Sequence, residues 1–543
     1  MPHPPLAVPA PAPRPPWDGW SEDAPSLPAG ARAIAAALLR GTPHPVPRRA
    51  PAPLPPTRLD EETVAALAAV TEVAIDDEAR RMHLGGKSTI DLLRRRLNRD
   101  EAAPDAVARP ATHDEVGAVL RVCDERGIAV VPFGGGTSVV GGVDPDGGID
   151  GAGARRLAVT LDLSRTAALL ALDETSLVAG FGAGTTGPQA EDLLGAHGLT
   201  LGHFPQSFAY ATLGGFAATR SSGQASRGYG RFDDLVQRLR VATPTGDLDL
   251  GRAPASAAGP DLRELFLGSE GTLGVITEVS VAVRRRPAAT VYGAWSFPDF
   301  ASGADAVRAL TQRGIRPTVV RLSDETETRV NAALGGHLTR LRGSLAVATF
   351  EGETAADATS LRARTDQVFR AHSARSRGED PALSWERGRF SSPALRDTLL
   401  GIGVLAETLE TATTWANLPT LKAVVTTALI DALAAVGTKP VVMCHISHVY
   451  PAGASLYFTV VAALSTDPIA QWTGAKQAAS LAIVAAGGTI THHHAVGRDH
   501  RAHLRAEIGE AGVRVLRAVK DAVDPHSILN PGVLIPPPPG DAP

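Results

Sequence analysis

Cysteine and surplus positive charge are both scarce in this chain of 543 residues. Only Cys123 and Cys444 occur, and Cys123 falls on the apolar side of a predicted helix, which excludes a disulfide framework and favours a reducing compartment. The 53 Lys and Arg residues are balanced by 57 Asp and Glu residues, so the composition has no electrostatic footprint for nucleic acid. We therefore expect no nucleic-acid partner and a substrate that binds in a pocket.

Long hydrophobic runs are missing as well. Residues 1–17 (MPHPPLAVPAPAPRPPW) lack the charged start and the apolar block of a signal peptide. No later run approaches the ~20 apolar residues that span a bilayer. The sequence predicts a soluble, cytoplasmic protein, and contact with a membrane surface through a lipid substrate stays open.

The chain is too long for one compact core, and its composition and periodicity divide it into five segments. The first is rich in proline and alanine and is expected to be a disordered tail, with one short helix at ARAIAAALLRG. The second is a helical preface, and two α+β units and a C-terminal segment with a histidine loop and a final helix follow. The five segments are residues 1–57, 58–104, 105–287, 288–475 and 476–543.

A glycine-rich loop follows a strongly predicted strand. Thr112 begins a helix with a capping box, Gly127 ends it, and IAVVPFGGGTSVVGG (128–142) reads as a buried strand that runs into the loop. Glycines let backbone N–H groups approach a phosphate closely. However, VDPDGGIDGAG (143–153) follows where a nicotinamide-binding site needs a helix. From this loop alone, a phosphate site of another architecture and a glycine turn without a ligand both stay open.

Three further segments carry small residues where a bulky cofactor needs close backbone approach: GAGTTG (182–187), HFPQSFAYATLGGFAATRSSG (203–223) and GSEGTLGVITEV (268–279). Together with PFGGGTSVVGG they resemble the FAD-binding domain of the vanillyl-alcohol oxidase family, over roughly residues 105–286 with a return at the C-terminus. The resemblance implies an α+β fold: a PCMH-type FAD-binding domain of two α/β subdomains, and a cap (substrate) domain with an antiparallel sheet flanked by helices. Because PFGGGTS contains no histidine, we expect non-covalent FAD.

The resemblance also assigns cofactor contacts to the pyrophosphate loop, the cofactor channel and the adenosine side. These residues are Pro132, Phe133, Gly134, Gly135, Gly136, Thr137, Ser138, Gln206, Ser207, Phe208, Ala209, Tyr210, Ala211, Thr212, Thr219, Arg220, Ser221, Ser222, Glu270, Gly271, Thr272, Leu273, Gly274, Val275 and Ile276.

Two branches of this family fit the C-terminal half differently. In FAD-dependent 2-hydroxy-acid dehydrogenases, H-x-G-D-G-N-L-H and E-H-G-I-G runs supply two histidines and a glutamate that resemble a divalent-metal site. In this chain, YPAGASLY (450–457) and HHAVG (493–497) place Tyr450, Tyr457 and His493 at those positions. Two phenols and one imidazole are a poor ligand set for a divalent metal at neutral pH, so we predict no metal site.

The other branch, the alkyldihydroxyacetonephosphate synthases, makes ether lipids without net redox. It carries an H-H-H triplet, an upstream tyrosine and two arginines in its substrate domain. WDGW (17–20) and HLGGKSTIDLLR (83–94) also resemble synthase segments. The resemblance gives catalytic candidates Tyr457, His492, His493 and His494, and substrate-binding candidates Arg396 and Arg321.

Each candidate has a plainer alternative. An arginine fork suits a phosphate, but Arg396 could be a solvated helix residue and Arg321 part of a structural ion pair. Tyr457 would be the general acid/base with its pKa lowered by cationic neighbours, or else a core tyrosine. The triplet would line the pocket and donate to phosphate or carbonyl oxygens, or else be a solvated loop or a metal site. His445 and His448 read as structural.

For activity, the synthase resemblance implies a transferase that exchanges the acyl group of acyl-dihydroxyacetone phosphate for a fatty alcohol. The run ALRDTLLGIGVLAETLETAT (394–413) is expected to be helical, and an apolar channel for the fatty chain is expected among apolar helices such as LLGIGVLAETL (399–409). Two alternatives stay open: a FAD-dependent oxidase or dehydrogenase of a 2-hydroxy acid or alcohol, and a flavin-binding protein without catalysis. The expected partners are these small lipids, and a homodimer stays open.

Overall fold

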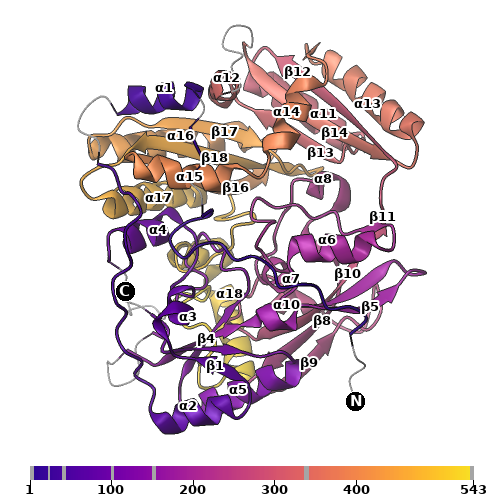
Figure 1. Cartoon of the computed structure of the whole chain (residues 1–543). Coiled ribbons are helices and arrows are strands. Elements are labelled where there is room, and N and C mark those ends of the chain that lie inside the picture. Colours follow the sequence, from indigo (N-terminus) through magenta and orange to yellow (C-terminus); the bar gives the residue numbers. More distant parts are fainter. Residues whose placement is uncertain are drawn as a thin grey trace.

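The computed structural model describes residues 5–22, 25–27, 29–39, 44–99, 103–148, 155–334 and 342–537. They form two α+β halves that lie one above the other in Figure 1. The half at the bottom contains three small sheets, and the half at the top contains one seven-stranded sheet. The predicted fold class is confirmed.

Along the chain, the lower half begins with helices, and the four-stranded and five-stranded sheets follow. Its elements are α2 (Glu61–Ala68), β1 (Glu72–Ala74), α3 (Asp77–Arg81), α4 (Thr89–Arg96), β2 (Ala106–Arg109), α5 (His113–Glu125), β3 (Ala129–Phe133), β4 (Ala158–Asp162), β5 (Leu169–Asp173), β6 (Val178–Gly182), α6 (Gly187–Gly195), β7 (Leu199–Thr200), α7 (Leu213–Ala218), α8 (Ser226–Tyr229), α9 (Phe232–Leu235), β8 (Val236–Thr243), β9 (Gly246–Leu250), α10 (Arg263–Phe266), β10 (Val275–Ala282) and β11 (Arg284–Arg285).

The two main sheets of the lower half differ in strand direction. In the order β1-β2-β4-β3, strands β2, β4 and β3 run parallel, whereas the order β5-β6-β10-β8-β9 is antiparallel throughout. Helix α5 begins where predicted, because the Thr112 side chain accepts from the N–H of Glu115, and the chain turns at Gly127 with φ of 63°. Strand β3 therefore enters the sheet and delivers the glycine loop at its C-terminal end.

The upper half carries the large antiparallel sheet and most of the remaining helices, whereas the last helix, Arg501–Val523, lies in the lower half. Its elements, with the C-terminal ones, are β12 (Ala289–Phe297), α11 (Phe300–Gln312), β13 (Val319–Ser323), α12 (Glu325–Leu334), β14 (Ser344–Gly352), α13 (Ala355–Arg370), β15 (Arg375–Ser376), α14 (Asp380–Gly388), α15 (Ser392–Gly401), β16 (Val404–Thr414), α16 (Leu418–Ala435), β17 (Val441–Ile446), β18 (Gly453–Ala463), α17 (Pro468–Ala485) and α18 (Arg501–Val523).

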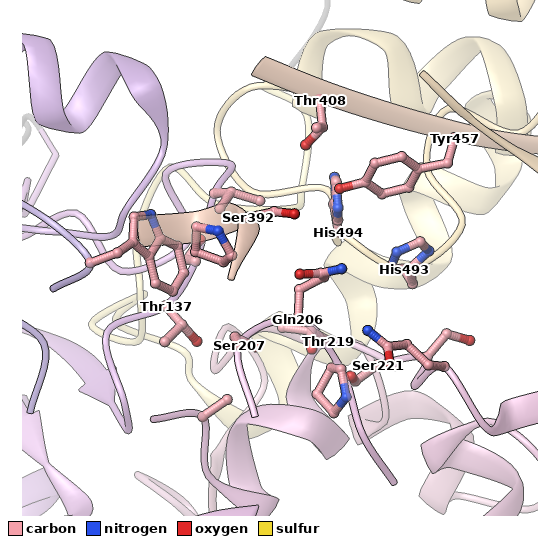
Figure 2. A pocket seen from close by; sticks show the side chains of 18 of the residues that line it. Thr137, Gln206, Ser207, Thr219, Ser221, Ser392, Thr408, Tyr457, His493 and His494 are labelled. Atoms are coloured by element: carbon pink, nitrogen blue, oxygen red, sulfur yellow. The ribbon is translucent and has the colours of Figure 1, made fainter. Parts of the chain in front are cut away.

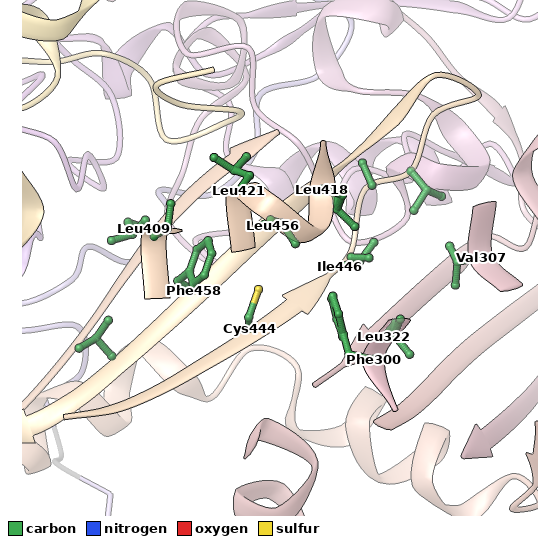
Figure 3. Close-up of a cluster of buried hydrophobic side chains, with 14 of the residues drawn as sticks. Phe300, Val307, Leu322, Leu409, Leu418, Leu421, Cys444, Ile446, Leu456 and Phe458 are labelled. Atoms are coloured by element: carbon green, nitrogen blue, oxygen red, sulfur yellow. The ribbon is translucent and has the colours of Figure 1, made fainter. Parts of the chain in front are cut away.

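The large sheet has the order β15-β12-β14-β13-β17-β18-β16 and packs its core against helices such as α11 and α16. Figure 3 shows this core, in which Leu456 and Phe458 of β18 lie near Cys444 of β17. Because side chains alternate along a strand, Tyr457 between them faces the opposite side of the sheet. The alternation thus separates a packed core face from the face that carries the candidate tyrosine.

The run 394–413, expected to be helical, forms helix α15 and then the long edge strand β16. Strand β16 pairs with β18 from Val404 opposite Ala463 to Thr414 opposite Gly453. The helical prediction was wrong for residues 404–413, because the apolar spacing in VLAETLETAT fits both periods and eleven paired residues on β18 decide for the strand.

The expectation of a disordered tail was also wrong for the described part of residues 1–57. This indigo segment in Figure 1 lies along both halves of the molecule. Arg14 forms an ion pair with Asp162 at the end of β4, and Trp20 is only 6% exposed. Helix α1 (Ala29–Leu38) forms where the short helix was predicted and contacts α12.

Buried cations anchor this segment. The Lys87 ammonium donates to the carbonyl oxygen of Trp17 at 3.1 Å, and the Arg96 guanidinium donates to the carbonyl oxygen of Asp18 and to the Asp397 carboxylate. Composition alone predicts disorder for such a segment. Its partners lie tens to hundreds of residues away in sequence, so they could not be seen in its own composition.

One helix also departs from the expectation that no run approaches a membrane span. Helix α16 has 18 residues with a mean hydropathy of 1.4, which meets the length and composition of a span. However, it contains Lys422 and Asp431, and its stripe of Leu421, Val425 and Leu429 is fully buried in the core of the large sheet. A core helix of a large sheet meets the same criterion.

Candidate active site

A cavity of about 490 Å³ lies between the two halves and contains most of the predicted site residues. The glycine loop and the small-residue segments line its lower side, and the large sheet and the histidine loop line its upper side. Alternate residues of β18, Tyr457, Thr459 and Val461, face it, as do Val404, Ala406 and Thr408 on the paired strand β16. Figure 2 shows Tyr457 and Thr408 above Gln206 and Thr219.

Close packing requires glycine in the loop. A Cβ atom on Gly135 would lie 2.0 Å from the carbonyl oxygen of Tyr210, and one on Gly134 would lie 2.4 Å from Thr212 Oγ1. Gly136 has φ of +64°, a conformation that side chains disfavour. The glycines therefore bring two chain segments together at the cavity wall.

The backbone of this loop also offers free donors. Across the described chain, the N–H groups of residues 135–139 have no protein acceptor, although this loop lines the cavity. The Ser138 hydroxyl oxygen holds the next turn by accepting from the N–H of Gly142 at 3.0 Å. Successive unpaired N–H groups form a concave anion site, so the loop fits the diphosphate of a dinucleotide.

The cavity wall continues into the C-terminal segment through Glu270. Its carboxylate accepts from the N–H groups of Val496 and Gly497, and its carbonyl oxygen accepts from the Asn530 side chain. Burial raises the pKa of Glu270 to about 7. The residue therefore joins the lower half to the chain that follows the histidine triplet.

Most predicted cofactor residues line the cavity, and some do not. Outside the lining, Arg220 pairs with Asp233 at 3.0 Å, and Tyr210 donates its hydroxyl to the carbonyl oxygen of Trp20. The other residues outside the lining are Phe208, Ala209, Thr272, Leu273 and Val275. Leu273 and Val275 are fully buried in the lower half, so their side chains support the wall instead of reaching the cavity.

The histidine triplet sits on a loop between α17 and α18, and a buried carboxylate holds its backbone. Glu410 of β16 accepts from the N–H groups of His492 at 2.5 Å, His493 at 3.0 Å and His494 at 2.8 Å. Burial raises the pKa of Glu410, but the positive charge that the neighbouring imidazoles carry when protonated outweighs burial and holds this pKa well below its usual range. Because the backbone donors are used up, the imidazoles carry the chemistry of this loop.

The triplet divides between two layers. His493 and His494 line the cavity, whereas His492 is absent from the lining and 8% exposed. Burial lowers the pKa of His492 and His494 to about 3 and lowers that of His493. At neutral pH these rings are uncharged, so they act as hydrogen-bond donors and acceptors.

Tyr457 stands at the centre of the upper wall. It lies opposite Glu410 on β16 and His445 on β17 in the strand register. Its ring stacks on that of His445 with centroids 4.8 Å apart and faces His493 at 6.0 Å. We expected the pKa of Tyr457 to be lowered, but burial raises it. A hydrogen bond with Thr408 lowers this pKa and offsets the effect of burial only in part. The phenol is therefore protonated at neutral pH.

Arg321 and Arg396 are the only cationic side chains among the described residues that line the cavity. Arg321 pairs with the buried Glu327 at 2.7 Å, as the structural alternative suggested, yet it still faces the cavity. Arg396 lies 3.3 Å from the Glu407 carboxylate and is 11% exposed. Each guanidinium has five N–H donors, so one carboxylate partner does not exhaust it.

One arm of the cavity is apolar. Helices α1, α12 and α15 line it, and its side chains include Ala31, Ala35, Val330 and Leu399. The expected channel is thus formed partly by the N-terminal segment, and Val404 and Ala406 of the expected run line the cavity from strand β16 instead of from a helix. An apolar arm beside two guanidinium groups fits a molecule with an anionic head and an alkyl chain.

Among the described residues, one group could hold a metal ion: His448, His492 and His493, whose ligand atoms lie within 4.8 Å of one another. The Nδ1 atoms of His492 and His493 are 3.0 Å apart, whereas two ligands of one zinc ion stand roughly 3.3 Å apart when each Zn–N bond is about 2.0–2.1 Å. His448 also stacks on His492 at 24°, so their ring planes do not converge on one point. A hydrogen bond explains the close pair better.

Sequence reasoning missed Glu410, Glu327 and the small residues of α1. In the sequence, the only signal from the two glutamates was a carboxylate in apolar surroundings. Glu410 was also missed because its strand was predicted to be a helix. His445 and His448 were read as structural, but both line the cavity.

Family models place the chain in a class. The model "FAD linked oxidases, C-terminal domain" matches residues 286–534, and "FAD binding domain" matches residues 104–249. Together with the free donors of the glycine loop, they define a two-domain flavoprotein that binds FAD.

Relatives narrow the class. Alkyldihydroxyacetonephosphate synthases of Trypanosoma brucei brucei and Dictyostelium discoideum are each 32% identical to this chain, over 87% and 85% of it and 79% and 78% of their own lengths. A solved structure of an alkyldihydroxyacetonephosphate synthase superposes with a TM-score of 0.81 at 28% identity and covers 95% of this chain and 98% of that one. The chain belongs to the alkyldihydroxyacetonephosphate synthase family.

Proposed function

We propose that this protein is a FAD-dependent transferase that exchanges the acyl group of acyl-dihydroxyacetone phosphate for a fatty alcohol and so forms an ether bond. One observation carries the proposal. The two guanidinium groups, a protonated tyrosine and two neutral imidazoles line one cavity together with the cofactor loop and the apolar side chains of α1, α12 and α15. This arrangement matches the phosphate, the reacting carbon and the alkyl chain of one substrate.

The arginines bind the phosphate in this proposal. Arg396 and Arg321 lie on the cavity wall with carboxylate partners that hold each guanidinium in place. A phosphate would accept their remaining N–H groups, and charge-assisted bonds of this kind contribute about 1.5–3 kcal/mol each. The apolar arm receives the chain of the acyl group or of the alcohol.

Tyr457 and the imidazoles handle protons. Because the Tyr457 hydroxyl is protonated, it donates to the carboxylate that leaves and afterwards accepts a proton from the incoming alcohol. The neutral rings of His493 and His494 provide acceptors for the proton that leaves the substrate carbon. The register of β16, β17 and β18 fixes these groups on one face of the sheet.

Residues of the glycine loop and the segments at 206–222 and 270–276 would hold FAD without a covalent link. Bound FAD supplies a ring that takes up and returns electron density, so the exchange needs no external oxidant. Glu270 would support this part of the cavity wall, because its carboxylate accepts from the N–H groups of Val496 and Gly497 in the loop that follows the triplet.

The test uses the purified yellow holoenzyme without oxygen. Incubation with acyl-dihydroxyacetone phosphate and a labelled fatty alcohol should give a labelled, alkali-stable ether and one free fatty acid per ether. A 2-hydroxy acid or an alcohol alone should leave the flavin oxidised. Bleaching by such compounds, without ether formation, would replace the proposal by an oxidoreductase.

The Tyr457→Phe variant separates chemistry from binding. It removes one hydroxyl and should lower ether formation by about 100-fold or more while the flavin absorbance stays that of the wild type. Acid precipitation should release all the FAD into solution. Full activity of the variant would remove Tyr457 from the mechanism.

A further inference from the structure

The proposed reaction must export a proton, and this inference rests on that function. An ester and an alcohol give an ether and a carboxylic acid, which ionises at neutral pH because its pKa lies near that of Glu. One proton is therefore released in the cavity for each turnover. The imidazoles that line the cavity are buried, so this proton needs a path to the surface.

A chain of hydrogen bonds leads away from the cavity. His493 lines it, the Nδ1 atom of His493 lies 3.0 Å from Nδ1 of His492, and Nε2 of His492 lies 2.7 Å from the Tyr450 hydroxyl oxygen. Neither His492 nor Tyr450 belongs to the cavity lining, and Tyr450 is partly exposed. We propose that His493, His492 and Tyr450 form a relay that carries the product proton from the cavity to solvent.

Each step of the relay balances. Nε2 of His493 takes the proton that the fatty acid loses on ionising in the cavity, while the proton on its Nδ1 passes to Nδ1 of His492; the proton taken from the substrate carbon returns to that carbon when the ether has formed. The proton on Nε2 of His492 then passes to the Tyr450 oxygen, and the Tyr450 hydroxyl proton leaves to water. A neutral imidazole has one donor and one acceptor nitrogen, so each ring stays uncharged before and after transfer.

The environment suits transfer through neutral rings. Burial lowers the pKa of both histidines, and burial raises that of Tyr450. The groups that face the outer end are Arg231, which hydrogen-bonds with Tyr450 and pairs with Asp233, and the carboxylate of Asp234. No member of the chain is thus held permanently in a charged form.

The backbone keeps the chain aligned. Glu410 fixes the N–H groups of both relay histidines, and Arg231 donates to the carbonyl oxygen of His492 at 3.2 Å. The ring of His448 stacks on the ring of His492, with centroids 5.0 Å apart. These backbone hydrogen bonds hold the loop in one conformation, so the Nδ1 atoms of His492 and His493 stay within hydrogen-bond distance of each other.

The kinetic test is the Tyr450→Phe variant, because it deletes the link between His492 and the surface and keeps the ring. We expect kcat for ether formation to fall roughly 10- to 100-fold with KM unchanged, and added imidazole buffer to restore part of the rate. The matched control is Tyr292→Phe, which removes another partly buried hydroxyl, on β12, whose neighbours include Glu386 and none of the relay residues. Equal kcat values for the two variants would overturn the relay.

A second readout needs no turnover. Nitrogen-15 NMR of histidine-labelled holoenzyme should show His492 and His493 sharing one proton between their Nδ1 atoms, so that one ring is the Nδ1–H tautomer and the other the Nε2–H tautomer. Two Nε2–H tautomers, or stoichiometric zinc with the nitrogen shifts of metal ligands, would overturn the relay. If the wild type makes no ether but the shared proton is found, the proposed function fails and the hydrogen-bonded chain stands.

Discussion

Two loops with a run of one residue type, Gly134–Gly136 and His492–His494, contribute residues to the wall of the same cavity and use opposite parts of the chain. The glycine loop has no side chains and leaves its N–H groups free toward the cavity. In the histidine loop, the N–H groups donate to the Glu410 carboxylate, and the imidazole side chains are the groups left for chemistry. The comparison shows that a run of one residue type predicts a ligand only when it is known whether its backbone N–H groups already have acceptors within the protein.

The strongest test of this comparison removes the carboxylate under the histidine loop. Glu410→Ala leaves three buried N–H groups without an acceptor, and breaking a buried charged network costs about 3–5 kcal/mol. We expect that loss in the free energy of unfolding from denaturant titration, while any folded fraction keeps FAD. Glu278→Ala, which removes a carboxylate paired with Arg240 at the surface, should cost less than about 1 kcal/mol. Equal losses would contradict the role of Glu410.

A side chain added to the glycine loop tests the other half of this comparison. Gly135→Val places a side chain where the Cβ alone would lie 2.0 Å from the Tyr210 carbonyl oxygen. Overpacking of this kind costs about 1–3 kcal/mol, so FAD should bind roughly 5- to 150-fold more weakly in a fluorescence titration. Gly474→Val, at a glycine with nothing within 4 Å of its Cβ, should leave the dissociation constant unchanged. Wild-type affinity in the Gly135 variant would refute the close approach.

Acid should weaken the histidine loop and spare the glycine loop. Burial lowers the folded-state pKa of His494 to about 3 from its ordinary value of 6.5, so its stabilisation is complete above pH 6.5 and is lost as pH falls toward 3. At pH 5 the wild type should have lost about 1–2 kcal/mol through this residue, and His494→Gln should show a correspondingly flatter pH profile of unfolding. The control is His526→Gln, at an exposed histidine. A variant profile as steep as the wild type would contradict the assignment.

The smallest expected effect concerns the turn after the glycines. Ser138→Ala removes the hydroxyl acceptor of the Gly142 N–H, a hydrogen bond with a net value of about 0.5–1.5 kcal/mol. FAD affinity should fall several-fold, and stability should change little. Ser256→Ala removes a similar bond to the N–H of Ala258 in an exposed turn and should leave FAD binding unchanged. An unchanged affinity for both would show that the loop holds its shape without Ser138.

The sequence allowed the local features of this molecule to be predicted. Thr112, Gly127 and the strand before the glycine loop could be placed because capping residues, glycine and β-branched runs act within a few positions. The same reasoning placed Tyr457 on a strand beside apolar neighbours. The cavity side of that strand followed from alternation once the core face was known.

What failed depended on distant partners. Strand β16 was taken for a helix because its pairing with β18 lies about 50 residues downstream, and the Pro-rich segment was taken for a tail because Asp397 and Lys87 anchor it from elsewhere. The pKa of Tyr457 was expected to fall because its cationic neighbours were visible in sequence and its burial was not. The functions of Glu410 and Glu327 depend on contacts that only the fold creates.

The N-terminal segment has a consequence for the order of assembly. Trp20 is synthesised long before its partner, because its N–H bonds to Asp397, which lies 377 positions later in the chain. Throughout that interval Trp20 and the helix behind it have no final docking site, and contacts between distant positions form slowly. This segment should therefore seal the cavity only after α15 has formed, and the interval before that is when the protein would most need a chaperone.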